Sequence, residues 1–150
     1  MKYSIIIPTY NHLDDCLRLC IDSICANTII NDSIEIIVVS NGSTDGTNEY
    51  LYEQKKNIKN LRVITTDEPL GYPLAVNMGI QISKGEFIVL LNNDAQILNF
   101  CEKNVWLDML HAPFADDNVG ITGPSKLYCK EVNSYFLIFI YVFVQNKTVG

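Results

Sequence analysis

The chain is short of positive charge. Its 150 residues include 11 Lys and Arg against 17 Asp and Glu, which gives a formal net charge of −6. Proteins that bind nucleic acid through a broad face need an excess of basic side chains, so we expect no nucleic-acid partner. The deficit still allows a local phosphate-binding pocket, particularly one built with a metal ion.

The five cysteines lack the spacing of a zinc site. No two of them form a Cys-x-x-Cys pair, and only Cys16 follows closely on a histidine, His12. This spacing predicts reduced thiols that serve as small apolar side chains, and it does not predict a zinc centre. Reduced thiols, together with the absence of a signal-peptide pattern in the first residues, predict a cytoplasmic protein.

Two common phosphate-binding motifs and a long apolar run are also missing. Gly42 and Gly46 fit neither Gly-x-Gly-x-x-Gly nor Gly-x-x-x-x-Gly-Lys-Ser/Thr, which excludes a Rossmann dinucleotide site and a P-loop.

The apolar run at 136–144 has nine residues, whereas about 20 are needed to span a bilayer. A buried strand is the interpretation we favour for this run. The alternatives are the start of a truncated membrane helix, or sequence unrelated to the rest.

Short apolar, β-branched runs alternate with segments of helical periodicity. We expect strands at 4–7, 34–39, 61–65, 86–91 and 119–122, and helices at about 14–25, 47–54, 74–83 and 100–110. Strands that are apolar throughout and alternate with helices are typical of an α/β fold, a mostly parallel sheet with helices on both faces. The length fits one such domain.

Polar residues follow the expected strands directly. Ligands of open parallel sheets bind at the carboxyl ends of the strands, so these residues are the first candidates for a site. They are Pro8, Thr9, Tyr10 and Asn11 after the first strand, Ser40 and Asn41 after the second, Asp67 and Glu68 after the third, and Asn92, Asn93 and Asp94 after the fourth. Four strand ends are thus expected to converge on one crevice.

Asp94 is the candidate metal ligand. It follows the apolar run 87–91, where a carboxylate without a partner is costly. Mg²⁺ and Mn²⁺ are commonly held by one or two carboxylates together with the phosphate oxygens of a substrate, so one aspartate suffices. The alternative is that Asp94 caps the turn that follows it.

Gly79 lies inside the expected helix 74–83, where glycine costs about 1 kcal/mol relative to alanine. Close packing of the helix against the sheet would explain this residue, and so would the close approach of a ligand. The sequence leaves both explanations open.

Taken together, these segments resemble the family 2 glycosyltransferases, which have the GT-A fold. The similar segments are 4–11 (SIIIPTYN), 38–47 (VVSNGSTDGT), 70–79 (LGYPLAVNMG) and 90–94 (LLNND), in the order and spacing of the family. The resemblance covers about residues 3–127, and Asn92-Asn93-Asp94 is similar to the rhamnosyltransferase-like branch. We therefore assign 1–127 to the N-terminal, nucleotide-sugar-binding portion of a GT-A domain, and 128–150 to an atypical apolar tail. A missing C-terminal half is implied.

The resemblance implies the metal-assisted, inverting transfer of a sugar from a nucleotide-diphosphate donor to a hydroxyl of a glycan or lipid-linked acceptor. Its implied donor-binding residues are Pro8, Thr9, Tyr10, Asn11, Ser40, Asn41, Gly71, Asn77, Asn92 and Asn93. Asn92-Asn93-Asp94 occupies the position of the DXD motif, so Asp94 would hold Mg²⁺ or Mn²⁺. The family further suggests polysaccharide biosynthesis, possible association with the membrane surface and a place at the inner face of the membrane.

Two departures from the family pattern are visible. Ser40-Asn41 carries no acid where the family usually has one or two aspartates that contact the nucleoside. The family's catalytic base belongs to an acidic motif further downstream, and nothing after Lys126 matches it, since Glu131 is the only acid there. The catalytic base is therefore not assigned. The alternative function is a non-catalytic nucleotide-binding remnant, or a fragment that requires a C-terminal half.

Overall fold

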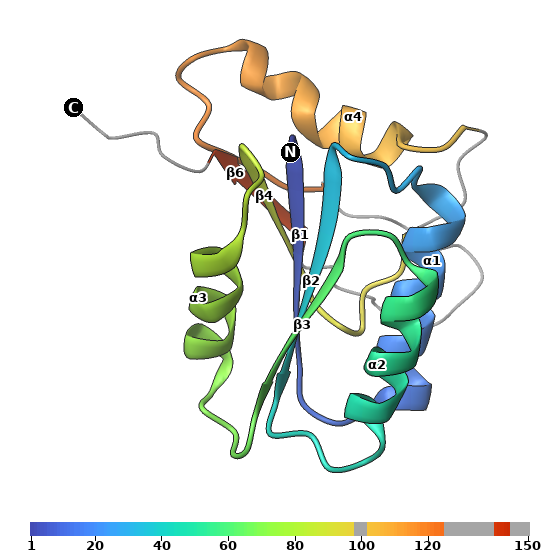
Figure 1. Cartoon of the computed structure of the whole chain (residues 1–150). Helices are drawn as coiled ribbons and strands as arrows, with labels where there is room; N and C mark the ends of the chain where they lie inside the picture. The colour runs from blue at the N-terminus through green and yellow to red at the C-terminus, as the bar shows by residue number, and fades with distance from the viewer. Residues whose placement is uncertain (98–101, 125–139, 145–150) are drawn as a thin grey trace, which may run out of the picture.

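Six strands form one sheet in the order β3-β2-β1-β4-β6-β5 (Figure 1). The computed structural model describes residues 1–97, 102–124 and 140–144. Four strands run parallel, namely β1 (Tyr3–Thr9), β2 (Ile34–Asn41), β3 (Leu61–Thr66) and β4 (Phe87–Leu91). Strand β6 (Ile140–Val144) runs antiparallel to β4, and the short β5 (Ile121–Thr122) runs antiparallel to β6. The expected mostly parallel sheet is confirmed.

Helices cover both faces of the sheet, as expected (Figure 1). Helix α3 (Tyr72–Ile82) packs on one face. The other face is covered by the π-helical turn η1 (Leu13–Leu17), α1 (Arg18–Asn27), α2 (Thr47–Asn57) and α4 (Val105–His111). A 3₁₀ turn, η2 (Ala112–Ala115), continues α4.

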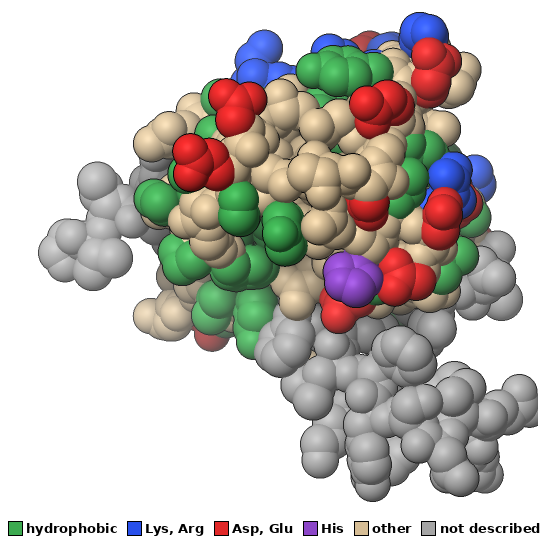
Figure 2. All heavy atoms as spheres, turned by 90° about the horizontal axis from the view of Figure 1, so that it is seen from below, with side chains coloured by type: hydrophobic (Ala, Val, Ile, Leu, Met, Phe, Trp, Pro, Cys, Tyr) green, Lys and Arg blue, Asp and Glu red, His purple; other side chains and the backbone are tan. Residues whose placement is uncertain are grey.

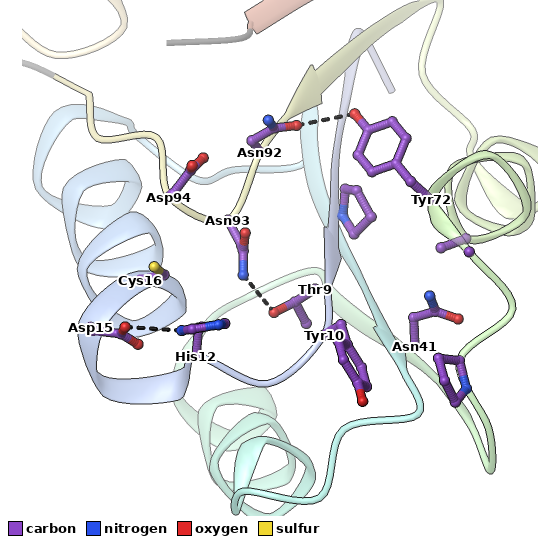
Figure 3. Close-up of a pocket in the computed structure, with 14 residues that line it drawn as sticks. Thr9, Tyr10, His12, Asp15, Cys16, Asn41, Tyr72, Asn92, Asn93 and Asp94 are labelled. Atoms are coloured by element: carbon purple, nitrogen blue, oxygen red, sulfur yellow. Dashed lines mark hydrogen bonds and ion pairs between the residues drawn. The ribbon is translucent and has the colours of Figure 1, made fainter. Parts of the chain in front are cut away.

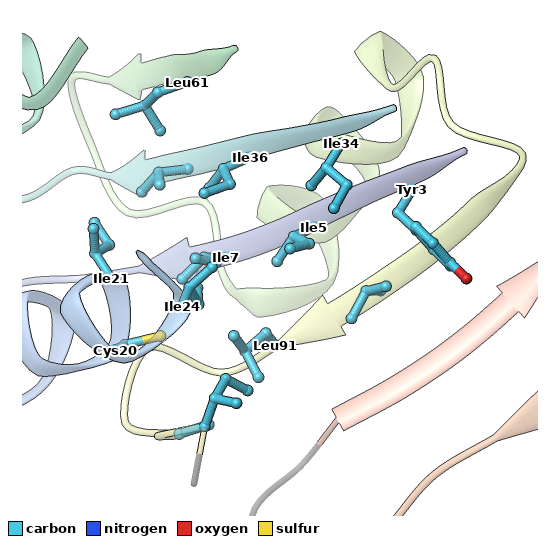
Figure 4. Close-up of a cluster of buried hydrophobic side chains, with 14 of the residues drawn as sticks. Tyr3, Ile5, Ile7, Cys20, Ile21, Ile24, Ile34, Ile36, Leu61 and Leu91 are labelled. Atoms are coloured by element: carbon cyan, nitrogen blue, oxygen red, sulfur yellow. The ribbon is translucent and has the colours of Figure 1, made fainter. Parts of the chain in front are cut away.

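The alternating side chains of β1 divide the core into two layers. Ile5 and Ile7 are fully buried in the layer that includes α1 (Figure 4). Ile6 belongs to the opposite layer, together with Ala75 of α3. The contact with α3 is tight: a Cβ added at Gly79 would lie 2.5 Å from Cγ2 of Ile6. Close helix–sheet packing therefore explains the glycine inside this helix.

Strand β1 continues through Pro8 to Thr9, two residues beyond its expected end at Ile7. Pairing with β4 stops at Ile6, while pairing with β2 continues to Thr9. Proline is tolerated here because this end of β1 has a paired strand on one side only.

Two elements near the C-terminus differ from the expected bounds. The expected helix 100–110 is present as α4, which begins only at Val105, while residues 98–101 lie outside the described part of the chain. Its delayed start has a tertiary cause: Asn104 adopts a left-handed φ of 70° and bonds to the end of α1 through Asn27 and Ile29. Strand β5 is limited to two residues of the expected 119–122.

Part of the apolar run 136–144 forms a strand. Residues Ile140–Val144 are β6, which lies between β4 and β5 in the sheet, and Val142 is buried there. A strand is the interpretation that we favoured for this run, and residues 136–139 lie outside the described part. The boundary near 127 stays a prediction. Within the described residues, every helix is too short or too polar to cross a membrane.

A buried carboxylate anchors the end of α3 to the sheet. Glu35 is 1% exposed and pairs with Arg62 at 3.1 Å, while Arg62 also donates to the carbonyl of Ile82, the last residue of α3. The hydroxyl of Ser4 and the backbone N–H of Lys84 each donate to Glu35 at 2.6 Å. Burial raises the pKa of Glu35, but these three donors outweigh it and hold the pKa below its ordinary value.

Replacing Glu35 by glutamine is expected to destabilise the protein at neutral pH by about 2 kcal/mol. Breaking a fully buried pair costs about 3–5 kcal/mol, and the smaller value reflects the 35% exposure of the Arg62 side chain. A carboxylate with a lowered pKa stabilises the fold above its unfolded-state pKa, near 4.5, and this contribution is lost as the pH falls through the folded-state pKa. The free energies of unfolding of wild type and Glu35→Gln, measured in urea, should therefore become equal at acid pH.

The matched control is Glu53→Gln. Glu53 pairs with Lys56 on α2, and both side chains are about two-thirds exposed (67% and 68%). Such pairs contribute about 0–1 kcal/mol, so this variant should unfold like the wild type. Equal effects of the two substitutions at pH 7 would contradict the anchoring role of Glu35.

Candidate functional site

An open cleft of about 570 Å³ lies at the carboxyl ends of β1, β2 and β4 (Figure 3). Its lining residues are Pro8, Thr9, Tyr10, His12, Asp15, Cys16, Asn41, Pro69, Gly71, Tyr72, Ala75, Asn92, Asn93 and Asp94. Within the described part of the chain, this lining includes no lysine or arginine. Figure 2 shows this end of the molecule, where the visible Lys and Arg side chains lie toward the edge. His12 is the only basic side chain among the described lining residues.

The structure brings most of the expected site residues together in this cleft. Those that line it are Pro8, Thr9, Tyr10, Asn41, Gly71, Asn92, Asn93 and Asp94. Asn11, Ser40 and Asn77 are not in the lining. Ser40 is fully buried within β2, and Asn77 lies on the exposed side of α3.

Asn11 holds the loops after β1 and β2 together. It adopts a left-handed φ of 55°, its backbone N–H donates to Oγ of Ser43 at 2.9 Å, and its Oδ1 accepts from the N–H of Thr44 at 2.8 Å. Both bonds join loops that are more than 30 residues apart in sequence. The structure therefore gives Asn11 a positioning role beside the cleft.

Asp45 performs a similar function at the start of two helices. Its carboxylate accepts from the N–H of Leu13 at 3.0 Å, at the first residue of η1, and from the hydroxyl of Thr47 at 2.6 Å, at the start of α2. Burial raises the pKa of Asp45, but these hydrogen bonds outweigh it and lower the pKa overall. The acid of the Asp-Gly turn thus fixes the loops around the cleft.

Asn41 connects the loop after β2 to the loop before α3. It is 6% exposed, and its Oδ1 accepts from the N–H of Leu70 at 2.8 Å. This bond assigns the amide orientation, because only the oxygen can accept. The amide nitrogen of Asn41 is then the polar atom of this side chain that remains for a ligand in the cleft.

Gly42 makes this contact between loops possible. Its φ is +77°, and a Cβ at this position would lie 2.5 Å from the nitrogen of Pro69 and 2.6 Å from the carbonyl carbon of Glu68. Both neighbouring atoms belong to backbone, which cannot move aside as a flexible side chain would. The loop carrying Pro69 and Gly71 therefore lies directly on Gly42.

Two hydrogen bonds fix the residues after β4. Nδ2 of Asn93 donates to Oγ1 of Thr9 at 3.0 Å, and the hydroxyl of Tyr72 donates to Oδ1 of Asn92 at 3.0 Å (Figure 3). Both asparagines are thereby oriented by neighbours on β1 and α3. The segment Asn92-Asn93-Asp94 is held on both sides, and Asp94 is left facing solvent.

Asp94 meets the requirements of a hard-cation ligand. Its side chain is exposed at the cleft, and within the described residues it forms no hydrogen bond or ion pair. The alternative role, a cap on the following turn, requires a hydrogen bond of its carboxylate to backbone N–H groups, and the described residues up to Ile97 provide none. A carboxylate without a partner beside neutral amide groups fits Mg²⁺ or Mn²⁺ completed by oxygen atoms of a bound phosphate.

Six lining residues were not singled out from the sequence as site residues: His12, Asp15, Cys16, Pro69, Tyr72 and Ala75. Nδ1 of His12 lies 2.9 Å from Oδ2 of Asp15, and this hydrogen bond raises the pKa of His12 and lowers that of Asp15. The signal for this pair was the i, i+3 spacing at the start of a helix. Tyr72 offered no local signal, because its partner Asn92 is 20 residues away.

Substitution of Gly42 by alanine is expected to destabilise the protein by about 2–4 kcal/mol. Backbone strain at positive φ contributes about 1 kcal/mol, and the overlap with Glu68 and Pro69 contributes about 1–3 kcal/mol more. Gly120→Ala is the matched control, because a Cβ at Gly120 meets nothing within 4 Å. Denaturant unfolding measures the free energy of unfolding of both variants. Equal values would refute the close contact of Gly42 with Glu68 and Pro69.

Comparisons with known proteins agree with this geometry. The model of glycosyl transferase family 2 matches residues 4–139. The poly(ribitol-phosphate) beta-glucosyltransferase of Bacillus spizizenii is 39% identical over 98 residues, which cover 65% of this chain and 15% of that protein.

Solved structures show the same fold. Mannosyltransferase PcManGT from Pyrobaculum calidifontis, in complex with GDP-Man and Mn²⁺, superposes with a TM-score of 0.74 at 25% identity, over 84% of this chain and 36% of that one. TarS of S. aureus superposes with a TM-score of 0.62 at 27% identity, over 78% and 20% of the two chains. This chain thus spans only a minor part of the length of these relatives. The expected GT-A fold is confirmed, and the chain belongs to glycosyl transferase family 2.

Proposed function

We propose that the cleft binds a nucleotide-diphosphate-sugar donor together with Mg²⁺ or Mn²⁺, for the inverting transfer of the sugar to an acceptor hydroxyl. The observation that carries this proposal is Asp94, an exposed carboxylate without a partner among the described residues, in a cleft formed by the ends of parallel strands. The family assignment supports the reaction class, and inversion follows from the family resemblance.

The charge of the cleft supports a role for a metal. A nucleoside diphosphate carries negative charge, and the described lining offers acids but no lysine or arginine. A divalent cation on Asp94 would supply the missing positive charge, and when bound it would neutralise charge on the departing diphosphate. The Mn²⁺ and GDP-Man in the PcManGT complex are consistent with such a pair of ligands.

The side chains of the cleft then bind and orient the donor. Tyr10, with 51% of its surface exposed at the rim, offers an aromatic face to a nucleoside base. The amide nitrogen of Asn41 offers a hydrogen-bond donor, and Thr9 and Pro8 line the same cleft. Gly71, with φ +86°, brings backbone close to the same space without a side chain.

Proton removal from the acceptor requires a base that the described residues do not identify. We propose that this base and the acceptor site belong to sequence beyond the donor-binding half, since the chain spans only 15–36% of relatives such as the B. spizizenii enzyme and PcManGT. A glycan or lipid-linked acceptor, a cytoplasmic location and contact with the inner membrane surface remain predictions. The family assignment and the relatives named as glycosyltransferases do not favour a non-catalytic remnant.

Donor binding is expected to depend on Mn²⁺ and on Asp94. Calorimetry with GDP-, UDP- and dTDP-sugars should show binding of at least one donor with Mn²⁺, and Asp94→Asn should weaken it about 10–100-fold and remove its dependence on Mn²⁺. Asp22→Asn, which changes an exposed acid on α1 outside the cleft, should bind like the wild type. No heat from any donor with a folded sample would refute the proposed donor site.

Asn41 is expected to influence the choice of base. In Asn41→Asp the carboxylate still accepts from the N–H of Leu70, but a hydrogen-bond acceptor replaces the amide donor that faces the cleft. Relative affinity should shift about tenfold toward bases that present an N–H, because a hydrogen bond to a charged group contributes about 1.5–3 kcal/mol. Competition binding measures the relative affinities for nucleoside diphosphates with different bases. An unchanged order of affinities would argue against contact between Asn41 and the base.

A further inference from the structure

Three chemically different metal-ligating side chains meet at the rim of the cleft. A ring nitrogen of His12, a carboxylate oxygen of Asp15 and Sγ of Cys16 all lie within 4.8 Å of one another. Figure 3 shows them on one side of the cleft, below Asp94, with Asn41 and Tyr72 on the other side. The donor-site proposal uses none of the three.

The backbone explains why they converge. Asn11 and His12 both have left-handed φ values, 55° and 59°, and this turn carries His12 directly into the π-helical turn η1. The carbonyl of His12 accepts from the N–H groups of Cys16 (3.2 Å) and Leu17 (3.0 Å), so the turn is closed by two hydrogen bonds. Side chains three and four positions after His12 then share its face of the helix.

The three side chains are accessible and can adjust. His12 and Asp15 are 65% and 66% exposed, and Cys16 is a half-buried free thiol. A tetrahedral ion binds its ligand atoms at about 2.0–2.3 Å, so these atoms lie less than 4 Å from one another. The ligand atoms of His12, Asp15 and Cys16 lie within 4.8 Å, so the side chains need to move by about an ångström or less to bind one ion. Exposed side chains make such a shift with little resistance from packing.

The donor set selects a different class of ion from that expected at Asp94. Nitrogen and thiolate sulfur favour borderline transition metals such as Zn²⁺, whereas Mg²⁺ takes oxygen ligands. The surroundings are also negative. Burial raises the pKa of Cys16, and the charges of Asp15 and Asp94 raise it further. The hydrogen bond to Asp15 raises the pKa of His12, and the charge of Asp45 adds a smaller effect in the same direction. A divalent cation at this position would be stabilised by all three acids.

We propose that His12, Asp15 and Cys16 form a second metal site, which binds a borderline divalent transition metal such as Zn²⁺ or Co²⁺. Binding replaces the hydrogen bond between His12 and Asp15 by bonds to the metal, and the Cys16 thiol releases its proton to solvent. All three residues line the cleft, so an ion held by them would be exposed to it. The cysteine spacing did not predict a zinc centre, because this site uses a single cysteine and takes its other ligands from a histidine and an aspartate within one turn.

Titration with Co²⁺ alone tests the site without any nucleotide, so its outcome is independent of the donor proposal. The reduced wild-type protein should develop a thiolate-to-cobalt charge-transfer band in the near ultraviolet, saturating at one ion per chain, and Zn²⁺ should displace the ion. Cys16→Ser should lose the band. His12→Ala changes an exposed side chain and should weaken binding about 100-fold or more, because the loss of an outer-shell partner alone costs about 10–100-fold.

Two variants serve as controls. Cys25→Ser removes another half-buried thiol, in helix α1 directly after η1, and should keep the band. Asp94→Ala should also keep it, which separates this site from the hard-cation site. The proposal is overturned if folded wild type gives no thiolate band, if Cys16→Ser retains it, or if His12→Ala binds Co²⁺ as tightly as the wild type.

Discussion

Side chains at the end of β2 and in the loop after it accept hydrogen bonds from backbone N–H groups of the neighbouring loops, and these bonds hold the cleft in shape. Asn41 accepts from Leu70 on one side, while Ser43 and Asp45 accept from Asn11 and Leu13 on the other. Loops at the ends of parallel strands have no ladder partners, and N–H groups left unpaired near the protein interior are costly. A single loop of small polar residues satisfies these donors and sets the distance between both walls of the cleft.

Helix α3 is positioned by side-chain hydrogen bonds at both ends. At its last turn, Arg62 contacts both the buried Glu35 and the carbonyl of Ile82, and at its first turn Tyr72 donates to Asn92. Between these ends, Gly79 lets the helix lie directly against Ile6 of the central strand. The wall that carries Gly71 and Tyr72 is therefore rigidly connected to the sheet, and Asp94 faces it with its carboxylate free of partners among the described residues.

The parallel strands and their helices could be predicted from the sequence because each is an uninterrupted apolar run or a helical pattern of its own. The same holds for the residues that follow the strands, since the topology alone brings Thr9, Asn41 and Asp94 to one edge. What could not be predicted depends on contacts distant in sequence. The bond of Tyr72 to Asn92, the contact of Gly42 with Pro69 and the pairing of β6 with β4 leave no local pattern.

Several residues of the expected motifs support the cleft from outside its lining. Asn11 and Asp45 belong to segments that resemble the family's donor-binding motifs, yet here they bond to backbone and support the residues that line the cleft.

The central claim is that this cleft binds a nucleotide together with a metal. Paramagnetic broadening of amide NMR signals tests it most directly, using substoichiometric Mn²⁺ with a nucleoside diphosphate. The account predicts nucleotide-dependent broadening of Asn92–Ala95, Thr9 and Asn41, with Lys2 and Phe114 at the opposite end of the sheet unaffected. Broadening centred on Lys2 and Phe114, or none that depends on the nucleotide, would contradict it.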